Sequence, residues 1–187
     1  MYSIYLLGVL GIVFIVQTVM PLSFTQLLMF DPTHVLTQPW GFITAIFLHG
    51  SLMHLFFNAF ALLMFGPFLE QRIGSKRFLQ LFFAAGIAGN VLYYLFYLAG
   101  IGQGLPALGA SGAIYGVLGA LAILAPNLMV LVMFVPMPMR AAALVWVTIE
   151  FFGTLTPNTG IASAAHLGGL FLGFAYAKFV LLKKSVQ

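Results

Sequence analysis

Four polar residues interrupt the long apolar runs of this chain, and their side chains are of the types that catalyse acyl transfer. They are His54, Asn58, Ser111 and His166. A serine hydroxyl becomes an effective nucleophile when a base takes its proton, and a neutral histidine is such a base. The oxyanion of the tetrahedral intermediate needs hydrogen-bond donors, which a histidine, a side-chain amide or a backbone N–H supplies. Taken alone, however, Ser111 in the stretch GASG is also typical of a packing residue in a membrane helix.

The composition decides the class of protein that must position these side chains. The 187 residues are 63% hydrophobic and only 5% charged, with a mean hydropathy of +1.12. Soluble domains carry about 25% charged residues, so this chain cannot cover a water-facing surface, and we predict an integral membrane protein. The chain contains no cysteine, which excludes disulfides, thiolate metal sites and a cysteine nucleophile. The net charge of +4 bears on membrane topology rather than on nucleic acid, which we do not expect as a partner.

Apolar runs predict an all-α, polytopic fold, because a helix needs about 20 apolar residues to cross a bilayer. Six transmembrane helices are predicted at residues 2–20, 51–69, 76–98, 108–125, 139–152 and 163–182, in one domain of residues 1–187. The start of the chain has no basic segment and is interpreted as the first helix, not as a signal peptide. Strands are not expected, because the apolar runs do not alternate. The long first loop, residues 21–50, should form short interfacial helical pieces anchored by Trp40.

The basic residues predict the orientation. The seven are Arg72, Lys76, Arg77, Arg140, Lys178, Lys183 and Lys184. With six crossings, all of them fall on one side, which the positive-inside rule makes cytoplasmic. Both termini are then cytoplasmic, and we expect a multi-pass protein of the plasma membrane. Helices 51–69, 108–125 and 163–182 all begin at the outer face.

This topology brings His54, Asn58, Ser111 and His166 to a similar depth near the outer face, where scattered polar residues would not coincide. His54 and Asn58 are four residues apart and share one helix face. No acid is expected beside the histidine: Asp31 lies in the first loop and Glu70 at the cytoplasmic end of its helix. Glu150, in the fifth helix, is interpreted as interfacial or bonded to a neighbour. The residues therefore favour a Ser–His dyad over a triad.

At these residues the sequence resembles the rhomboid intramembrane serine proteases in their minimal six-helix form. The matching stretches are HGSLMHLFFN (49–58), EQRIGS (70–75), GASGAIYG (109–116) and AAHLGGLFLG (164–173). The resemblance implies that Ser111 is the nucleophile and His166 the general base, with His54, Asn58 and the Ser111 amide as oxyanion donors. It implies supporting roles for His49, Tyr115, Gly109, Gly112, Gly169 and Gly173, among which Gly169 and Gly173 would let the sixth helix approach the fourth. No cofactor or metal is implied.

The activity implied is hydrolysis of peptide bonds in or near the transmembrane helices of membrane protein substrates. One departure is Gly41 after Trp40, where many relatives have arginine, and we expect it to cost a loop contact but not catalysis. The fifth helix and the loop TLTPNTGIAS (154–163) are the predicted substrate gate. Three alternatives stay open: a non-catalytic rhomboid-like protein that binds or escorts membrane helices, a small transporter or channel, and a histidine zinc site.

Overall fold

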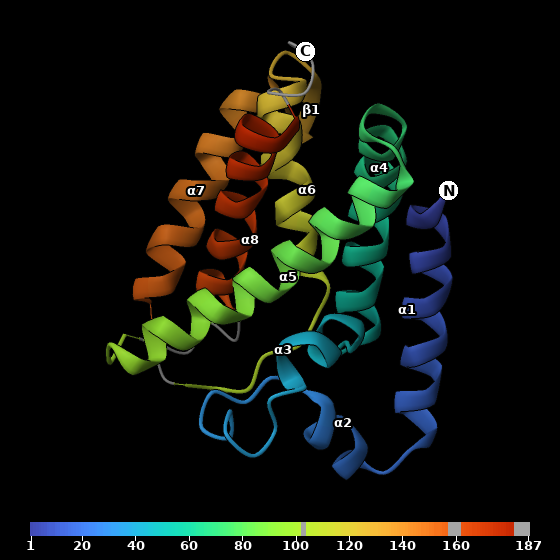
Figure 1. Ribbon diagram of the computed structural model, residues 1–187, viewed down its shortest axis with the longest axis vertical. Coiled ribbons are helices and arrows are strands. Elements are labelled where there is room, and N and C mark those ends of the chain that lie inside the picture. The colour runs from blue at the N-terminus through green and yellow to red at the C-terminus, as the bar shows by residue number, and fades with distance from the viewer. Residues whose placement is uncertain (102–103, 157–161, 182–187) are drawn as a thin grey trace.

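The structure, a computed structural model, describes residues 1–101, 104–156 and 162–181, and these are mainly helical (Figure 1). The elements are α1 (Tyr2–Val19), α2 (Leu22–Leu28), α3 (Gly41–Thr44), the 3₁₀ helix η1 (Ala45–Phe47), α4 (Leu52–Ile73), α5 (Ser75–Leu98), α6 (Ser111–Leu124), β1 (Met129–Val132), β2 (Val135–Pro138), α7 (Met139–Leu155), α8 (Ser163–Tyr176) and the π-helical η2 (Ala177–Leu181). Each of the six predicted ranges overlaps one of α1, α4, α5, α6, α7 and α8.

Four helices of the described ranges are long and apolar enough to cross a membrane. They are α1, α4, α5 and the continuous segment Ser163–Leu181, which joins α8 to η2. The helix α6 is shorter and apolar, and ten of its 14 residues are buried. Figure 1 shows α6 among the other long helices, with α5 crossing in front of it and α1 at the edge beside α4. The chain is therefore a multi-pass helical membrane protein, whereas the number of crossings stays a prediction.

Glycines bring α6 and α8 into direct backbone contact. A Cβ atom added to Gly169 would lie 1.9 Å from the carbonyl oxygen of Gly112, and one added to Gly173 would lie 2.1 Å from that of Gly116. Real Cβ atoms essentially never come closer than 3.0 Å to such atoms. Only residues without a side chain fit at these two positions of α8, so the glycines set the distance between the two helices.

The start of α1 is held by a carboxylate from another helix. Glu70 of α4 is buried and accepts hydrogen bonds from Tyr2 N (2.7 Å), Ser3 N (2.9 Å) and Ser3 Oγ (2.7 Å). Its Oε1 atom also accepts from Ser75 Oγ at 2.5 Å. The first N–H groups of a helix have no partner within the helix and attract negative charge. Glu70 therefore caps α1 and ties it to the turn between α4 and α5.

A two-stranded hairpin precedes α7, so the prediction that the chain has no strands is wrong for this segment. The strands β1 and β2 pair antiparallel, with Met129 opposite Pro138 and Leu131 opposite Pro136. The two prolines are two residues apart, so their missing N–H groups face the same edge of β2, away from β1. The prolines therefore prevent a helix here but permit pairing on one side.

The loop of residues 21–50 contains the short helices α2, α3 and η1, whereas their position at the membrane interface stays a prediction. Trp40 Nε1 donates to the carbonyl oxygen of Leu27 at 2.7 Å. At Gly41 a Cβ atom would lie 2.8 Å from the carbonyl oxygen of Met29. Gly41 therefore allows the start of α3 to lie directly against the backbone that follows α2, a contact that a larger residue would obstruct.

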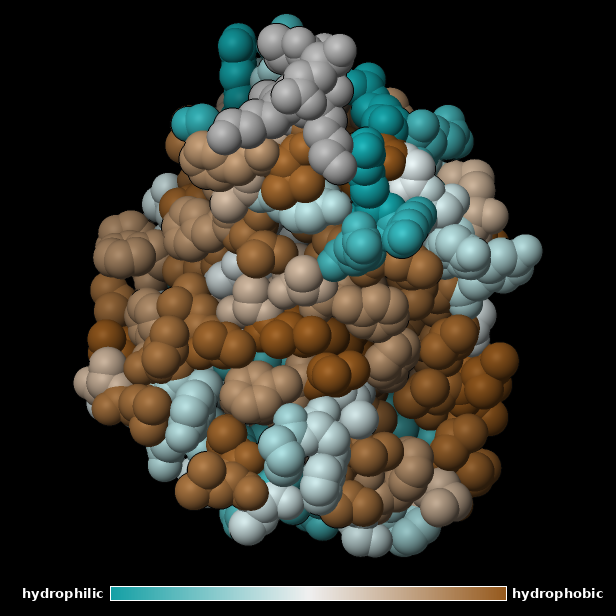
Figure 2. Space-filling view, viewed as in Figure 1, coloured by the Kyte–Doolittle hydropathy of each residue, from teal (hydrophilic) through white to brown (hydrophobic). Residues whose placement is uncertain are grey.

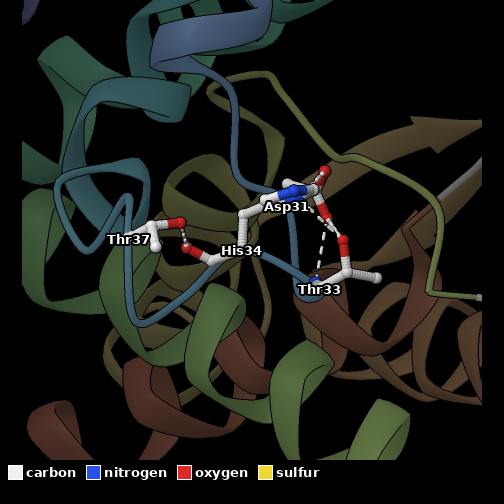
Figure 3. A network of polar contacts seen from close by, with 4 residues as sticks. All are labelled: Asp31, Thr33, His34 and Thr37. Atoms are coloured by element: carbon white, nitrogen blue, oxygen red, sulfur yellow. Dashed lines mark hydrogen bonds and ion pairs between the residues drawn. The ribbon is translucent and has the colours of Figure 1, made fainter.

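A compact polar turn follows α2 in this loop (Figure 3). The Asp31 carboxylate accepts from Thr33 N at 2.8 Å and Thr33 Oγ1 at 2.6 Å, and His34 Nδ1 lies 2.9 Å from its Oδ2 atom. Burial raises the pKa of Asp31, but the hydrogen bonds from Thr33 and His34 outweigh it and hold the pKa below its usual value. The turn begins directly after Phe30. The backbone of Phe30 pairs with that of Ala107 through two hydrogen bonds.

The basic residues gather at one end of the bundle. Figure 2 shows hydrophobic side chains over the middle of the visible face and hydrophilic ones mainly at the end where α4 meets α5. Arg72 donates to the carbonyl oxygen of Leu124 at the end of α6, and the Arg140 amide donates to that of Pro126. Lys183 and Lys184 lie outside the described residues. Which side of the membrane this end faces stays a prediction.

Candidate active site

Ser111 and His166 meet where α6 and α8 begin. Ser111 is the first residue of α6, and His166 is the fourth residue of α8. The Oγ atom of Ser111 lies 2.7 Å from the Nε2 atom of His166, which is the distance of a good O–H···N hydrogen bond. The glycine contacts between α6 and α8 begin within one helical turn after this pair, at Gly112 and Gly169. A hydroxyl and a neutral imidazole at this distance have the geometry that a nucleophile and its general base require in acyl transfer.

The chain enters α6 through an extended turn at Gly109. Gly109 has a φ of +131°, and its amide donates to the carbonyl oxygen of Ala45. A Cβ atom at this position would lie 2.8 Å from Nε2 of His54 and 3.7 Å from Nδ2 of Asn58. The absence of a side chain thus leaves space for the two predicted oxyanion donors beside the start of α6.

His54 and Asn58 lie on one face of α4 and point into the same cavity as Ser111 and His166. The cavity has a volume of about 890 Å³, and all four residues line it. The amide of Asn58 donates to the carbonyl oxygen of His54 at 3.1 Å, so one of its two N–H groups remains for another acceptor. Aromatic and aliphatic side chains, including Phe57, Tyr93 and Trp146, form much of the remaining wall.

His49, for which the resemblance implied a supporting role, does not line this cavity. Its side chain is buried, and its ring lies 5.1 Å from that of His54, centroid to centroid. The side chain of Gln17 holds its backbone, accepting from His49 N at 3.0 Å and donating to His49 O at 3.4 Å. Burial, together with the positive charge that His54 can carry, lowers the pKa of His49 to about 4. His49 is therefore neutral at physiological pH.

Tyr115 stacks on His166. The two rings are 4.4 Å apart, centroid to centroid, and their planes differ by 5°. Stacking over the whole ring restricts rotation of the imidazole. The resemblance to the rhomboid proteases implied a supporting role for Tyr115, and the contact with His166 is compatible with such a role.

Glu150 corrects the expectation that no acid lies beside the histidine. Its Oε1 atom lies 3.0 Å from the Nδ1 atom of His166 and accepts a hydrogen bond of 2.5 Å from the Tyr115 hydroxyl. Ser111, His166 and Glu150 thus form a continuous line of contacts. The sequence offered one usable signal, because Glu150 lies five residues before the end of α7 and hence about 7.5 Å from that end. That depth is similar to the depth of His166 in α8, but the direction of the side chain could not be read from depth.

The predicted substrate gate lies only partly within the described residues. The predicted gate TLTPNTGIAS includes residues 157–161, which lie outside the described residues. Within the described ranges, no three His, Asp or Glu side chains are grouped closely enough to hold a metal ion.

The sequence of the chain is similar to those of several known proteins. A sequence model of the Rhomboid domain matches residues 36–183. This range includes the four polar residues of the candidate site, which are His54, Asn58, Ser111 and His166. The chain is 36% identical over 153 residues to Rhomboid protease GluP of Bacillus subtilis (strain 168), covering 78% of this chain and 27% of that protein. It is 34% identical over 161 residues to Rhomboid protein 1, mitochondrial, of Saccharomyces cerevisiae, covering 84% of this chain and 46% of that protein.

A third relative is named as inactive. The chain is 32% identical over 82 residues to Inactive RHOMBOID-like protein 8 of Arabidopsis thaliana, covering 44% of this chain and 22% of that protein. The chain thus spans less than half the length of each of these three relatives. The match to the domain nevertheless extends from the first loop to the last described helix, and it includes the serine, the histidines and the glycines that join α6 to α8. The chain belongs to the rhomboid family.

Proposed function

We propose that the protein is an intramembrane serine protease, which hydrolyses peptide bonds in or near the transmembrane helices of membrane protein substrates. The observation that carries the proposal is the distance of 2.7 Å between Ser111 Oγ and His166 Nε2. The two residues are 55 positions apart in the chain and lie on different helices. Both also face a cavity large enough for an extended segment of a substrate.

In the proposed reaction, His166 Nε2 takes the hydroxyl proton of Ser111 while Oγ attacks the carbonyl carbon of the scissile peptide bond. The resulting oxyanion would accept hydrogen bonds from the Ser111 amide, the Asn58 amide and the His54 ring. The C–N bond then breaks, and the departing amine takes the proton from Nε2. Water hydrolyses the Ser111 ester in a second cycle, in which His166 again accepts and returns a proton. No cofactor enters these steps.

We propose further that the cavity opens toward the outer face of the membrane and that both termini are cytoplasmic. The basic side chains at the opposite end of the helices support this orientation, because cytoplasmic loops carry an excess of Lys and Arg. Catalysis needs water, which is scarce in the hydrocarbon region. A cavity that opens near one membrane surface supplies water to Ser111 while lipid surrounds the outside of the helices.

A fluorophosphonate probe tests the nucleophile directly, because it forms a covalent bond with an activated serine. We expect labelling of the wild-type protein at Ser111, loss of labelling in Ser111→Ala, and strong loss in His166→Ala. Thr148→Val is the matched control, since Thr148 is exposed on α7 and its hydroxyl donates to the carbonyl oxygen of Leu144 in the same helix. Labelling of folded Ser111→Ala at the wild-type rate would show that Ser111 is not the activated serine.

A further inference from the structure

A buried carboxylate lies behind the histidine, and the mechanism above gives it no role. Glu150 lies in the apolar helix α7 and is only 5% exposed. Ionisable side chains within a membrane protein's helices are costly unless they are paired, and they commonly mark functional sites. The cavity is not lined by Glu150, so the residue is not placed to touch a substrate. Its carboxylate contacts Tyr115, His166 and Ser163.

The carboxylate faces the ring nitrogen of His166 that is not used by Ser111. Oε1 of Glu150 lies 3.0 Å from Nδ1, while Ser111 Oγ lies 2.7 Å from Nε2. The Nδ1 atom is buried and makes no well-aligned hydrogen bond with any described residue. Its contact with Glu150 is therefore within ion-pair distance, but the N–H bond does not point straight at the carboxylate. The two nitrogens of a neutral imidazole share one proton, and a partner at one nitrogen decides which of them carries it.

Tyr115 fixes both members of this pair. Its hydroxyl donates to Oε1 of Glu150 at 2.5 Å, and its ring stacks on the imidazole. Trp146 of α7 packs edge-on against Tyr115, with the ring centroids 6.4 Å apart. Three helices thus contribute to one assembly, with Tyr115 from α6, Glu150 from α7 and His166 from α8. The same oxygen atom of Glu150, Oε1, makes the contacts with Tyr115 and with His166 Nδ1.

We propose that Glu150 is a positioning residue for His166 in the reaction proposed above, on which this inference rests. The carboxylate keeps the imidazole proton on Nδ1, so Nε2 is free to accept the proton of Ser111. Once Nε2 has taken that proton, the negative charge of Glu150 stabilises the imidazolium. The titratable groups facing the region of His166 are His54 from α4, Tyr93 from α5, Tyr115 from α6 and Glu150 from α7. Among these groups, the carboxylate is the one that carries a negative charge at neutral pH.

A purely structural role is the competing explanation, and Glu70 provides the matched control. Glu70 is also a buried, hydrogen-bonded glutamate in a membrane helix, but it bonds to Ser3, Tyr2 and Ser75 and not to His166. Changing either glutamate to glutamine removes one buried charge and should lower thermal stability. If Glu150 only stabilised the fold, the two variants would behave alike in catalysis.

The experiment measures the pH dependence of kcat and KM for cleavage of a model transmembrane substrate by the wild type, Glu150→Gln, Glu150→Asp and Glu70→Gln. In Glu150→Gln we expect kcat at the pH optimum to fall about 10- to 100-fold and KM to change little, because residue 150 is outside the cavity. We expect the acidic limb of its profile to move about one unit or more to lower pH, because the charge that stabilised the imidazolium is gone. Glu150→Asp keeps the charge and should keep the acidic limb near that of the wild type. Glu70→Gln should keep the wild-type profile.

Two results would overturn the inference while leaving the proposed function intact. One is Ser111-dependent cleavage by Glu150→Gln with the kcat and acidic limb of the wild type. The other comes from ¹⁵N NMR of His166 in the wild-type protein, which needs no variant at position 150 to fold. We expect Nδ1 to be protonated and Nε2 unprotonated at neutral pH, and the opposite tautomer would contradict the assignment. Failure of the proposed function is a different result, because the wild type would then show no cleavage that depends on Ser111.

Discussion

The contact between α6 and α8 predicts that one methyl group at Gly169 disrupts the site. In Gly169→Ala the new Cβ atom would lie 1.9 Å from the carbonyl oxygen of Gly112, and a distance of at least 3.0 Å is needed. The helices must therefore separate by about 1 Å, because the obstacle is backbone and cannot rotate away. His166 is three residues before position 169 on α8. The same displacement stretches the 2.7 Å contact between Ser111 and His166 to about 3.8 Å, beyond hydrogen-bond range.

The expected losses follow from this displacement. Overpacking costs about 1–3 kcal/mol of stability, and a 1 Å misplacement of catalytic groups costs about 100-fold in rate. Thermal unfolding in detergent micelles and cleavage of a model substrate measure the two effects. Gly11→Ala in α1 is the matched control, since no atom lies within 4 Å of its added Cβ, and it should be neutral or stabilising by about 0.5–1 kcal/mol. A Gly169→Ala protein with wild-type melting and cleavage would refute the reasoning.

Three further predictions concern stability and are measured by thermal unfolding in detergent. Glu70→Gln should cost about 3 kcal/mol, because buried donors at the start of α1 lose a charged acceptor; an unchanged melting temperature would contradict this role. Gly41→Arg should cost about 1–3 kcal/mol by overpacking against Met29, whereas Gly8→Ala, with open space around it, should not. Stability should fall as the pH drops from about 6.5 to about 4, because the unfolded chain protonates His49 and the folded chain, with its pKa of about 4, does not. His49→Phe should flatten that dependence, and an unchanged slope would exclude His49 as its source.

The elements that carry the site could be predicted because each rests on a long apolar run. The predicted ranges 51–69 and 163–182 correspond to α4 and to the Ser163–Leu181 segment. Counting residues from the starts of the three helices predicted that His54, Asn58, Ser111 and His166 lie at a similar depth. The cavity that these four line is consistent with that count.

The partner of His166 could not be predicted in the same way. Depth along a helix follows from residue number, but the direction of a side chain depends on how the helix is rotated about its axis. The sequence around Glu150 is apolar on several faces, so it does not define the rotation of α7. The hairpin of β1 and β2 was missed for a related reason, because Pro136 and Pro138 signal the end of a helix but not what replaces it. Likewise, the glycine at position 41 predicted the loss of an arginine contact, but not the close approach of its backbone to Met29.

Cleavage in proteoliposomes is the measurement that tests the proposed protease activity most directly. Purified wild-type protein and Ser111→Ala would be reconstituted side by side with a model substrate that has one transmembrane helix. We predict that the wild type produces two fragments, cut in or near the substrate helix, and that the folded Ser111→Ala protein produces none. Equal cleavage by the two proteins, or no cleavage by either of them, would contradict the proposal that Ser111 is the nucleophile of an intramembrane protease.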